Sequence, residues 1–149
     1  AVGSLEESIR PQVVIVGNGP ERETLVKKAS QAGVDLHLPG AVSPTELGHW
    51  YQRSGIVAVP SLREGFGLVA AEAAAAGRAV VASAVGGIPE VVVHGSSGLL
   101  VEPGQVEDLA TALRSVDPRW GENGPRRVSQ LGMEAHGKIV SELFDELIR

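Results

Sequence analysis

Short, uninterrupted apolar runs alternate with longer amphipathic segments along most of the chain. The runs Val13–Val16 and Ile56–Val59 are rich in β-branched residues and contain no polar position. Runs of this kind are typical of strands that are buried on both faces of a parallel sheet. Strands are therefore expected at residues 13–16, 34–38, 56–59, 79–82 and 98–101.

The segments between these runs predict helices. The clearest start is Ser43-Pro44-Thr45-Glu46, where Ser43 is a cap, Pro44 suits the first helical position and Glu46 completes a capping box. Helices are expected at residues 21–32, 44–54, 67–76, 106–116 and 134–149, with a short turn after Gly87 and a Gly/Pro-rich link before the last helix. Residues 1–10 are interpreted as the end of a preceding helix and its link to the first strand.

Alternating strands and helices at this spacing predict βαβ units with right-handed crossovers. We therefore expect one α/β domain over residues 1–149, with a Rossmann-like, doubly wound parallel sheet. Trp50 and Tyr51 lie on the capped helix and are interpreted as packing residues.

The amino-acid composition argues against several functional classes. The 149 residues carry a formal net charge of −5, and scattered basic residues disfavour a nucleic-acid surface. There is no cysteine, and the four histidines, His37, His49, His94 and His136, have no metal-site spacing, so no metal site is expected. We also expect no cofactor. No apolar run reaches the roughly 20 residues of a membrane span. We expect a cytoplasmic protein that reaches a membrane surface only through a further domain.

Three glycine-bearing loops follow predicted strands: Gly17-Asn18-Gly19, Glu64-Gly65-Phe66-Gly67 and Gly86-Gly87. Ligands of open α/β sheets bind outside the carboxyl ends of the strands, and amides at a helix start bind anions. The amides of Phe66, Gly67 and Leu68 are therefore candidates for a phosphate site. A glycine loop before a helix is by itself common in α/β proteins.

Two glutamates in the middle loop and the helix after it indicate which ligand the loop would bind. Glu64 precedes the helix, and Glu72 lies about 1.4 turns beyond Gly67. Because a carboxylate accepts two neighbouring hydroxyl hydrogens, Glu72 suits a ribose diol and Glu64 suits a sugar. Glu72 alone equally suits an exposed helix position, so the whole segment Glu64–Glu72 carries the prediction of a nucleotide-sugar site.

Across residues 13–113 the sequence resembles the C-terminal, donor-binding domain of GT-B-fold, family-4 retaining glycosyltransferases. The matching motifs are VIVGNGPER at 14–22, VPS at 59–61, EGFGLVAAE at 64–72, Gly77, VVAS at 80–83, GGIPE at 86–90 and GSSGLLV at 95–101. The resemblance implies a sugar transferred from a UDP-, GDP- or ADP-sugar with its anomeric configuration kept, and no requirement for a metal.

The resemblance also implies roles for individual residues. Glu72 would bind the ribose, and Glu64 would be the catalytic-site carboxylate on the transferred sugar. The diphosphate and sugar would lie on the backbone of the loop, and the nucleotide on two other segments. The implied donor-binding set is completed by Gly65, Phe66, Gly67, Leu68 and Val69, by Gly17, Asn18 and Gly19, and by Leu38, Pro39 and Gly40.

Departures from the family limit what this chain does alone. The family's Arg/Lys clamp on the diphosphate belongs to a loop that precedes this region, and Gly3-Ser4-Leu5 carries Ser where that loop has Arg. We expect an N-terminal Rossmann-like partner domain, which binds the unidentified acceptor, to lie outside this chain, so that the chain alone is inactive. The alternative is a stand-alone nucleotide- or sugar-binding module; a GT-B phosphorylase or epimerase is a weaker third reading.

Overall fold

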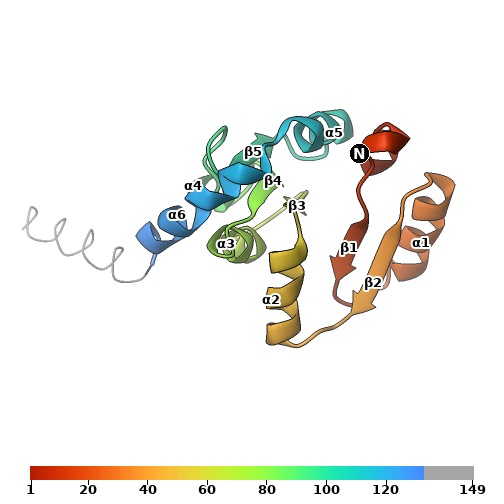
Figure 1. Cartoon of the computed structure of the whole chain (residues 1–149), viewed down its shortest axis with the longest axis horizontal. Coiled ribbons are helices and arrows are strands. Elements are labelled where there is room, and N and C mark those ends of the chain that lie inside the picture. Colours follow the sequence, from red (N-terminus) through yellow and green to blue (C-terminus); the bar gives the residue numbers. More distant parts are fainter. Residues whose placement is uncertain (133–149) are drawn as a thin grey trace, which may run out of the picture.

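The computed structural model describes residues 1–132 as parallel strands with helices around them (Figure 1). The strands are β1 (Val13–Val16), β2 (Leu36–Gly40), β3 (Ile56–Val59), β4 (Ala79–Ser83) and β5 (Gly98–Val101). The α-helices are α1 (Arg22–Gln31), α2 (Pro44–Arg53), α3 (Leu68–Ala75), α4 (Ile88–Val91), α5 (Val106–Ser115) and α6 (Gly124–Gln130). Short 3-10 helices are η1 (Val2–Ser4), η2 (Glu7–Ile9) and η3 (Pro118–Asn123). The predicted alternation of strands and helices, and with it the Rossmann-like α/β class, is confirmed.

The strands form two parallel sheets instead of the single predicted one. One sheet has the order β1-β2 and the other β3-β4-β5. In Figure 1 the first sheet lies with α1, the second lies among α3 to α6, and α2 joins them. An apolar run predicts a strand but not its neighbours, so the sequence pattern left this division undetermined. We call residues 56–132 the packed half and residues 11–55 the open half.

The packed half is a layered structure with β4 at its centre. On one face, Val80 and Ala82 pack with Ala70, Ala73 and residues of α4. On the other face, Ala79 and Val81 pack with Ala112 of α5 and with Val116. Every residue of β4 is buried because strands cover both its edges and helices cover both its faces.

The open half contains no buried residue, and the same holds for the whole stretch 6–58. Its strands are half-exposed, and Val26 on α1 is 52% exposed. The β1–β2 register slips between Val14 and Val16, where Pro39 has no N–H to donate. The open half therefore has regular secondary structure without a core of its own.

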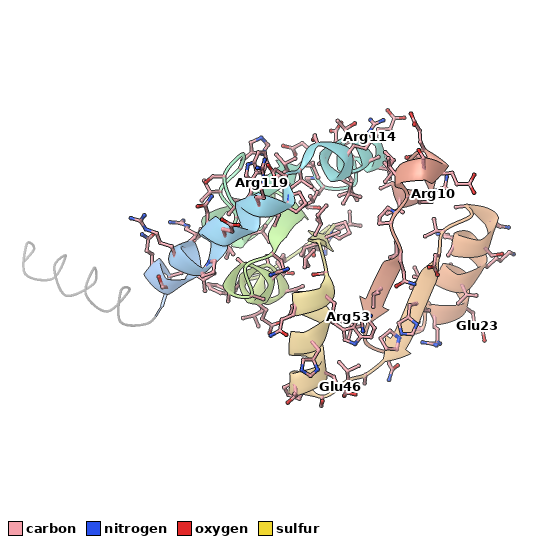
Figure 2. The ribbon with its side chains drawn as sticks, in the orientation of Figure 1. Arg10, Glu23, Glu46, Arg53, Arg114 and Arg119 are labelled. Atoms are coloured by element: carbon pink, nitrogen blue, oxygen red, sulfur yellow. The ribbon has the colours of Figure 1, made fainter. Side chains whose placement is uncertain are left out.

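The Arg10 side chain links the first residues to the open half. The Arg10 guanidinium donates to the carbonyls of Gly3 and Leu5 and to those of Ala32 and Gly33 at the end of α1. Figure 2 shows Arg10 between the amino-terminal turns and α1. The interpretation of residues 1–10 as the end of a helix is wrong, because the segment forms two 3-10 turns.

The link expected after residue 116 is also wrong, because η3 and α6 occupy it. Pro118 and Pro125 stand in the first turns of these helices, where proline is tolerated. A Cβ at Gly121 would strike the Gly77 carbonyl, and one at Gly124 would strike the Ala74 carbonyl. Gly121 permits close packing of η3 on the segment between α3 and β4, and Gly124 permits close packing of α6 on α3. The helix expected at 134–149 lies outside the described residues.

Candidate functional site

The loop from Glu64 to Gly67 connects β3 to α3 and lies against the loop that follows β4. The Gly87 amide donates to the Gly65 carbonyl at 2.7 Å. Gly86 has φ +55°, and a Cβ there would strike the Glu64 carbonyl. The structure therefore brings together two of the three glycine-bearing loops, and it does so by backbone contacts that a side chain at Gly86 would prevent.

Gly67 sets the start of α3. It has φ +84°, which favours glycine, and a Cβ there would lie 2.9 Å from Ile88 Cγ1. As the N-cap it has no side chain to bind the first helical amides. Phe66, Leu68 and Val69 beside it are 52%, 65% and 46% exposed. The amino terminus of α3 is thus an open, partly positive surface with apolar surroundings.

The Glu64 carboxylate accepts hydrogen bonds from residues of its own loop. Its Oε1 accepts from the Gly65 amide at 3.0 Å and its Oε2 accepts from Ser61 Oγ at 3.5 Å. The side chain is half-buried at the carboxyl end of β3. This carboxylate is therefore positioned before α3 begins, as the sequence predicted.

Glu72 points instead toward α2. Its Oε2 accepts from the Tyr51 hydroxyl at 2.9 Å. Burial, together with the hydrogen bond and the negative charge of Glu72, raises the pKa of the Tyr51 phenol above its usual range. The sequence predicts only a packing role for Tyr51. It does pack beside the core, but it also orients Glu72, and no short-range motif links positions 51 and 72.

The Gly17 loop meets the end of β2. The Gly17 amide donates to the Gly40 carbonyl at 2.8 Å, and Arg22 Nη2 donates to the Leu38 carbonyl at 3.1 Å. A Cβ at Gly40, which has φ +84°, would lie 3.1 Å from Asn18 Oδ1. Residues 38–40 belong to β2 itself, so the strand predicted at 34–38 is displaced by two residues. The carbonyls of Leu38 and Gly40 thus already accept hydrogen bonds from Arg22 and Gly17.

The candidate residues therefore form two groups, one at the end of β1 and β2 and one at the end of β3 and β4. Among residues 1–132 no hydrogen bond joins the two groups. A cavity of about 130 Å³ at the carboxyl ends of β3 to β5 is smaller than the usual 300–1,000 Å³ of a ligand pocket. It is lined by Pro60, Ser83, Val101, Glu102, Gly104, Gln105, Val106 and Leu109. The site as described is an open surface.

Other residues considered in the sequence have structural roles. His94 Nδ1 accepts from the Leu100 amide at 3.1 Å, which confirms a role in the turn. Trp50 packs against His37, with ring centroids 5.4 Å apart. Within residues 1–132 no group of acidic or histidine side chains is suited to a metal ion, and no helix is long and apolar enough to span a bilayer.

Comparison with known proteins gives a consistent picture. The model of the family described as glycosyl transferases group 1 matches residues 1–118. A D-inositol 3-phosphate glycosyltransferase from Corynebacterium kroppenstedtii is 37% identical over 142 residues, which cover 89% of this chain and 32% of that protein. The chain thus spans about a third of the length of this relative.

Solved structures agree in fold. Sucrose-phosphate synthase from Thermosynechococcus elongatus superposes with a TM-score of 0.76 at 33% identity, covering 92% of this chain and 38% of that one. Anabaena HepE in complex with UDP-glucose gives a TM-score of 0.76 at 23% identity over 93% of this chain and 42% of that one, a likeness of fold alone. These neighbours are GT-B glycosyltransferases with Rossmann-like folds. On its sequence and its fold, the chain belongs to the glycosyl transferases group 1 family.

Proposed function

We propose that this chain is the donor-binding part of a retaining glycosyltransferase that uses a nucleoside-diphosphate sugar. The observation that carries the proposal is a pair of hydrogen-bonded carboxylates, one in the loop before the open amino terminus of α3 and one in the second turn of that helix. Glu64 is held by Ser61 and Gly65, and Glu72 is held by Tyr51. Amides that lie between two carboxylates along the chain suit a ligand with a diphosphate between two polyhydroxyl groups.

The proposed roles follow from this order. Glu72 binds the ribose diol, the backbone from Gly65 to Val69 binds the diphosphate and sugar, and Glu64 binds the hydroxyls of the transferred sugar. The segments Gly17–Gly19 and Leu38–Gly40 contact the nucleoside through their backbone.

Two further features belong to the proposal. The donor charge is met by the amides and dipole of α3 together with cationic side chains, so we expect no dependence on a metal ion. The acceptor binds to a second domain of the longer protein, as the one-third coverage of a relative suggests. The chain by itself is then expected to bind donor without transferring the sugar.

Calorimetric titration of the 149-residue chain with UDP, GDP and ADP, and with their glucose conjugates, tests the proposal. We expect one nucleotide to bind in preference to the others, with equal affinity in the presence of a chelator. A chain that binds none of the six compounds at millimolar concentration would contradict it.

Substitutions distinguish the proposed roles of the two carboxylates. Glu72→Gln is expected to weaken the nucleotide and the nucleotide sugar alike by roughly tenfold or more, since a hydrogen bond to a charged group contributes about 1.5–3 kcal/mol. Glu64→Gln is expected to weaken only the nucleotide sugar. Glu107→Gln, an exposed acid in the first turn of α5, is the matched control and should bind like the parent. Equal binding by all three variants would refute the assignment.

A further inference from the structure

The Tyr51 side chain reaches from α2 to α3. Its hydroxyl donates to Glu72 Oε2 at 2.9 Å, a contact between residues 21 positions apart in the sequence. None of the residues that the sequence predicts for the site belongs to α2 (Pro44–Arg53). The hydrogen bond therefore adds a further element to the candidate site.

The Tyr51 hydroxyl is a fixed hydrogen-bond donor. The ring packs against the core cluster that includes Val59, Ala70 and Ala73. Because a tyrosine side chain has only two torsions, packing of the ring determines where the hydroxyl lies. Burial, and then the contact with Glu72, raises the pKa of the phenol, so the hydroxyl keeps its proton at neutral pH.

The end of α2 that carries Tyr51 is linked to the segment that follows α3. The Tyr51 carbonyl accepts from Ser54 Oγ at 2.8 Å. The Ser54 carbonyl accepts from Arg78 Nη1 at 3.3 Å, and Arg78 Nε donates to the Ala76 carbonyl at 3.1 Å. Figure 1 shows this end of α2 beside α3. These bonds hold α2 in place relative to α3, and with it the Tyr51 hydroxyl relative to Glu72.

The Glu72 carboxylate depends on Tyr51 for its orientation. Glu72 is exposed in the second turn of α3. Within residues 1–132 its carboxylate takes part in no other hydrogen bond and in no ion pair. An exposed glutamate without such a contact occupies several rotamers, and fixing one of them when a ligand binds costs conformational entropy.

The contact with Tyr51 leaves the carboxylate able to bind a diol. A carboxylate accepts hydrogen bonds at about four positions, two on each oxygen. Tyr51 occupies one position on Oε2, and Oε1 accepts no hydrogen bond from the described residues. Two neighbouring ribose hydroxyls can therefore bind to Glu72 while the bond from Tyr51 persists.

We propose that Tyr51 is a positioning residue of the nucleoside site, which holds the Glu72 carboxylate in one orientation and thereby sets a preference for ribose over 2′-deoxyribose. The inference rests on the proposed function, in which Glu72 binds the ribose diol. Because the carboxylate is oriented in advance, the second hydroxyl binds without the cost of fixing a rotamer. Tyr51 acts on the ligand only through Glu72.

Nuclear magnetic resonance tests the orientation of Glu72 without any nucleotide. Three-bond couplings across the side-chain torsions of Glu72 report whether it occupies one rotamer. We expect one rotamer in the 149-residue chain and averaged couplings in Tyr51→Phe, which keeps the ring and removes only the hydroxyl. Thr111→Val is the matched control, because it removes an exposed hydroxyl that accepts from Arg114 on α5. It should leave the Glu72 couplings unchanged.

Calorimetric titration with UDP and 2′-deoxy-UDP, and with the guanine and adenine pairs, measures the ribose preference. We expect the parent chain to bind the ribonucleotide roughly tenfold more tightly than its deoxy counterpart, as for one hydrogen bond to a charged group. Tyr51→Phe should reduce this ratio to about threefold or less, and Glu72→Gln should reduce it at least as far. Adding Tyr51→Phe to Glu72→Gln should change the ratio no further, since both act through one carboxylate. Thr111→Val should keep the ratio of the parent.

Two results overturn the proposal. Phenylalanine packs like tyrosine, so a packing role alone predicts a ratio that Tyr51→Phe leaves unchanged while Glu72→Gln lowers it. Averaged Glu72 couplings in the parent chain overturn the proposal whatever the titrations give. Couplings that behave as expected, with no binding of any of these nucleotides at millimolar concentration, would refute the proposed function and still support Tyr51 as the group that orients Glu72.

Discussion

The two halves of the molecule start from the same sequence signal and reach opposite degrees of burial. Val13–Val16 in the open half and the strand β4 in the packed half are both short, apolar runs. β4 is buried at every position, while Ile15 is 39% exposed. The difference lies in their neighbours, because β4 has strands on both edges and β1 has one. Burial of a strand is therefore set by what pairs with it as much as by its own residues.

The comparison predicts that glycine substitutions act differently in the two halves. A Cβ at Gly98 would strike the Val80 carbonyl, whereas one at Gly48 in α2 meets nothing within 4 Å. Gly98→Ala should lower the free energy of unfolding by about 3 kcal/mol. Gly48→Ala should raise it by about 0.5–1 kcal/mol, because alanine favours a helix interior. Urea denaturation measures both, and equal losses would contradict the division into halves.

Truncation of a valine should also destabilise the packed half more than the open half, by less than the glycine substitution does. Val80→Ala removes two methyl groups from a site with 0% exposure and should cost about 2 kcal/mol. Val26→Ala, at 52% exposure on α1, should change stability by less than about 0.5 kcal/mol. Thermal unfolding followed by circular dichroism checks the pair. A large loss at Val26 would show that α1 is covered in solution.

The cap of α2 tests whether the open half is folded at all. Ser43 accepts from the Glu46 amide, and Glu46 accepts from the Ser43 amide, which lowers the pKa of Glu46. Ser43→Ala should cost about 1 kcal/mol. No loss would indicate that α2 is already unfolded in the parent. Figure 2 shows Glu46 at the start of α2.

The lowered pKa of Glu46 also gives a pH dependence. A carboxyl with a depressed pKa stabilises the fold above its unfolded value and loses that contribution as the pH falls through the folded value. Stability should therefore decrease below about pH 4. Ser43→Ala should weaken this decrease, and an unchanged pH profile would argue against the capping box.

The smallest effect concerns the contact between α2 of the open half and α3 of the packed half. Tyr51 is the one tyrosine in the sequence, so ultraviolet absorbance reports its ionisation alone. Its raised pKa predicts a midpoint above the ordinary value of about 10, and stability that is lost as the pH rises further. Glu72→Gln should lower the midpoint only in part, because burial is the largest cause. A midpoint at the ordinary value would mean that Tyr51 and Glu72 do not meet.

Much of the fold and part of the candidate site could be predicted from local sequence. Ser43 and Glu46 predicted the start of α2, and the segment Glu64–Glu72 placed two carboxylates around a helix start. Such features depend on residues within one or two turns of each other, so periodicity and capping chemistry suffice to find them. The structure confirms the positions of these residues, while the roles of the donor-binding residues remain predictions.

The tertiary structure alone decided which segments meet. The contact of Gly86 with the Glu64 carbonyl, the hydrogen bond from Tyr51 to Glu72 and the packing of Gly124 on α3 each join residues distant in sequence. The division into two sheets is of the same kind. A sequence determines what each segment is able to form, because propensity and capping are local. Pairing and burial depend on the neighbours that the whole fold supplies.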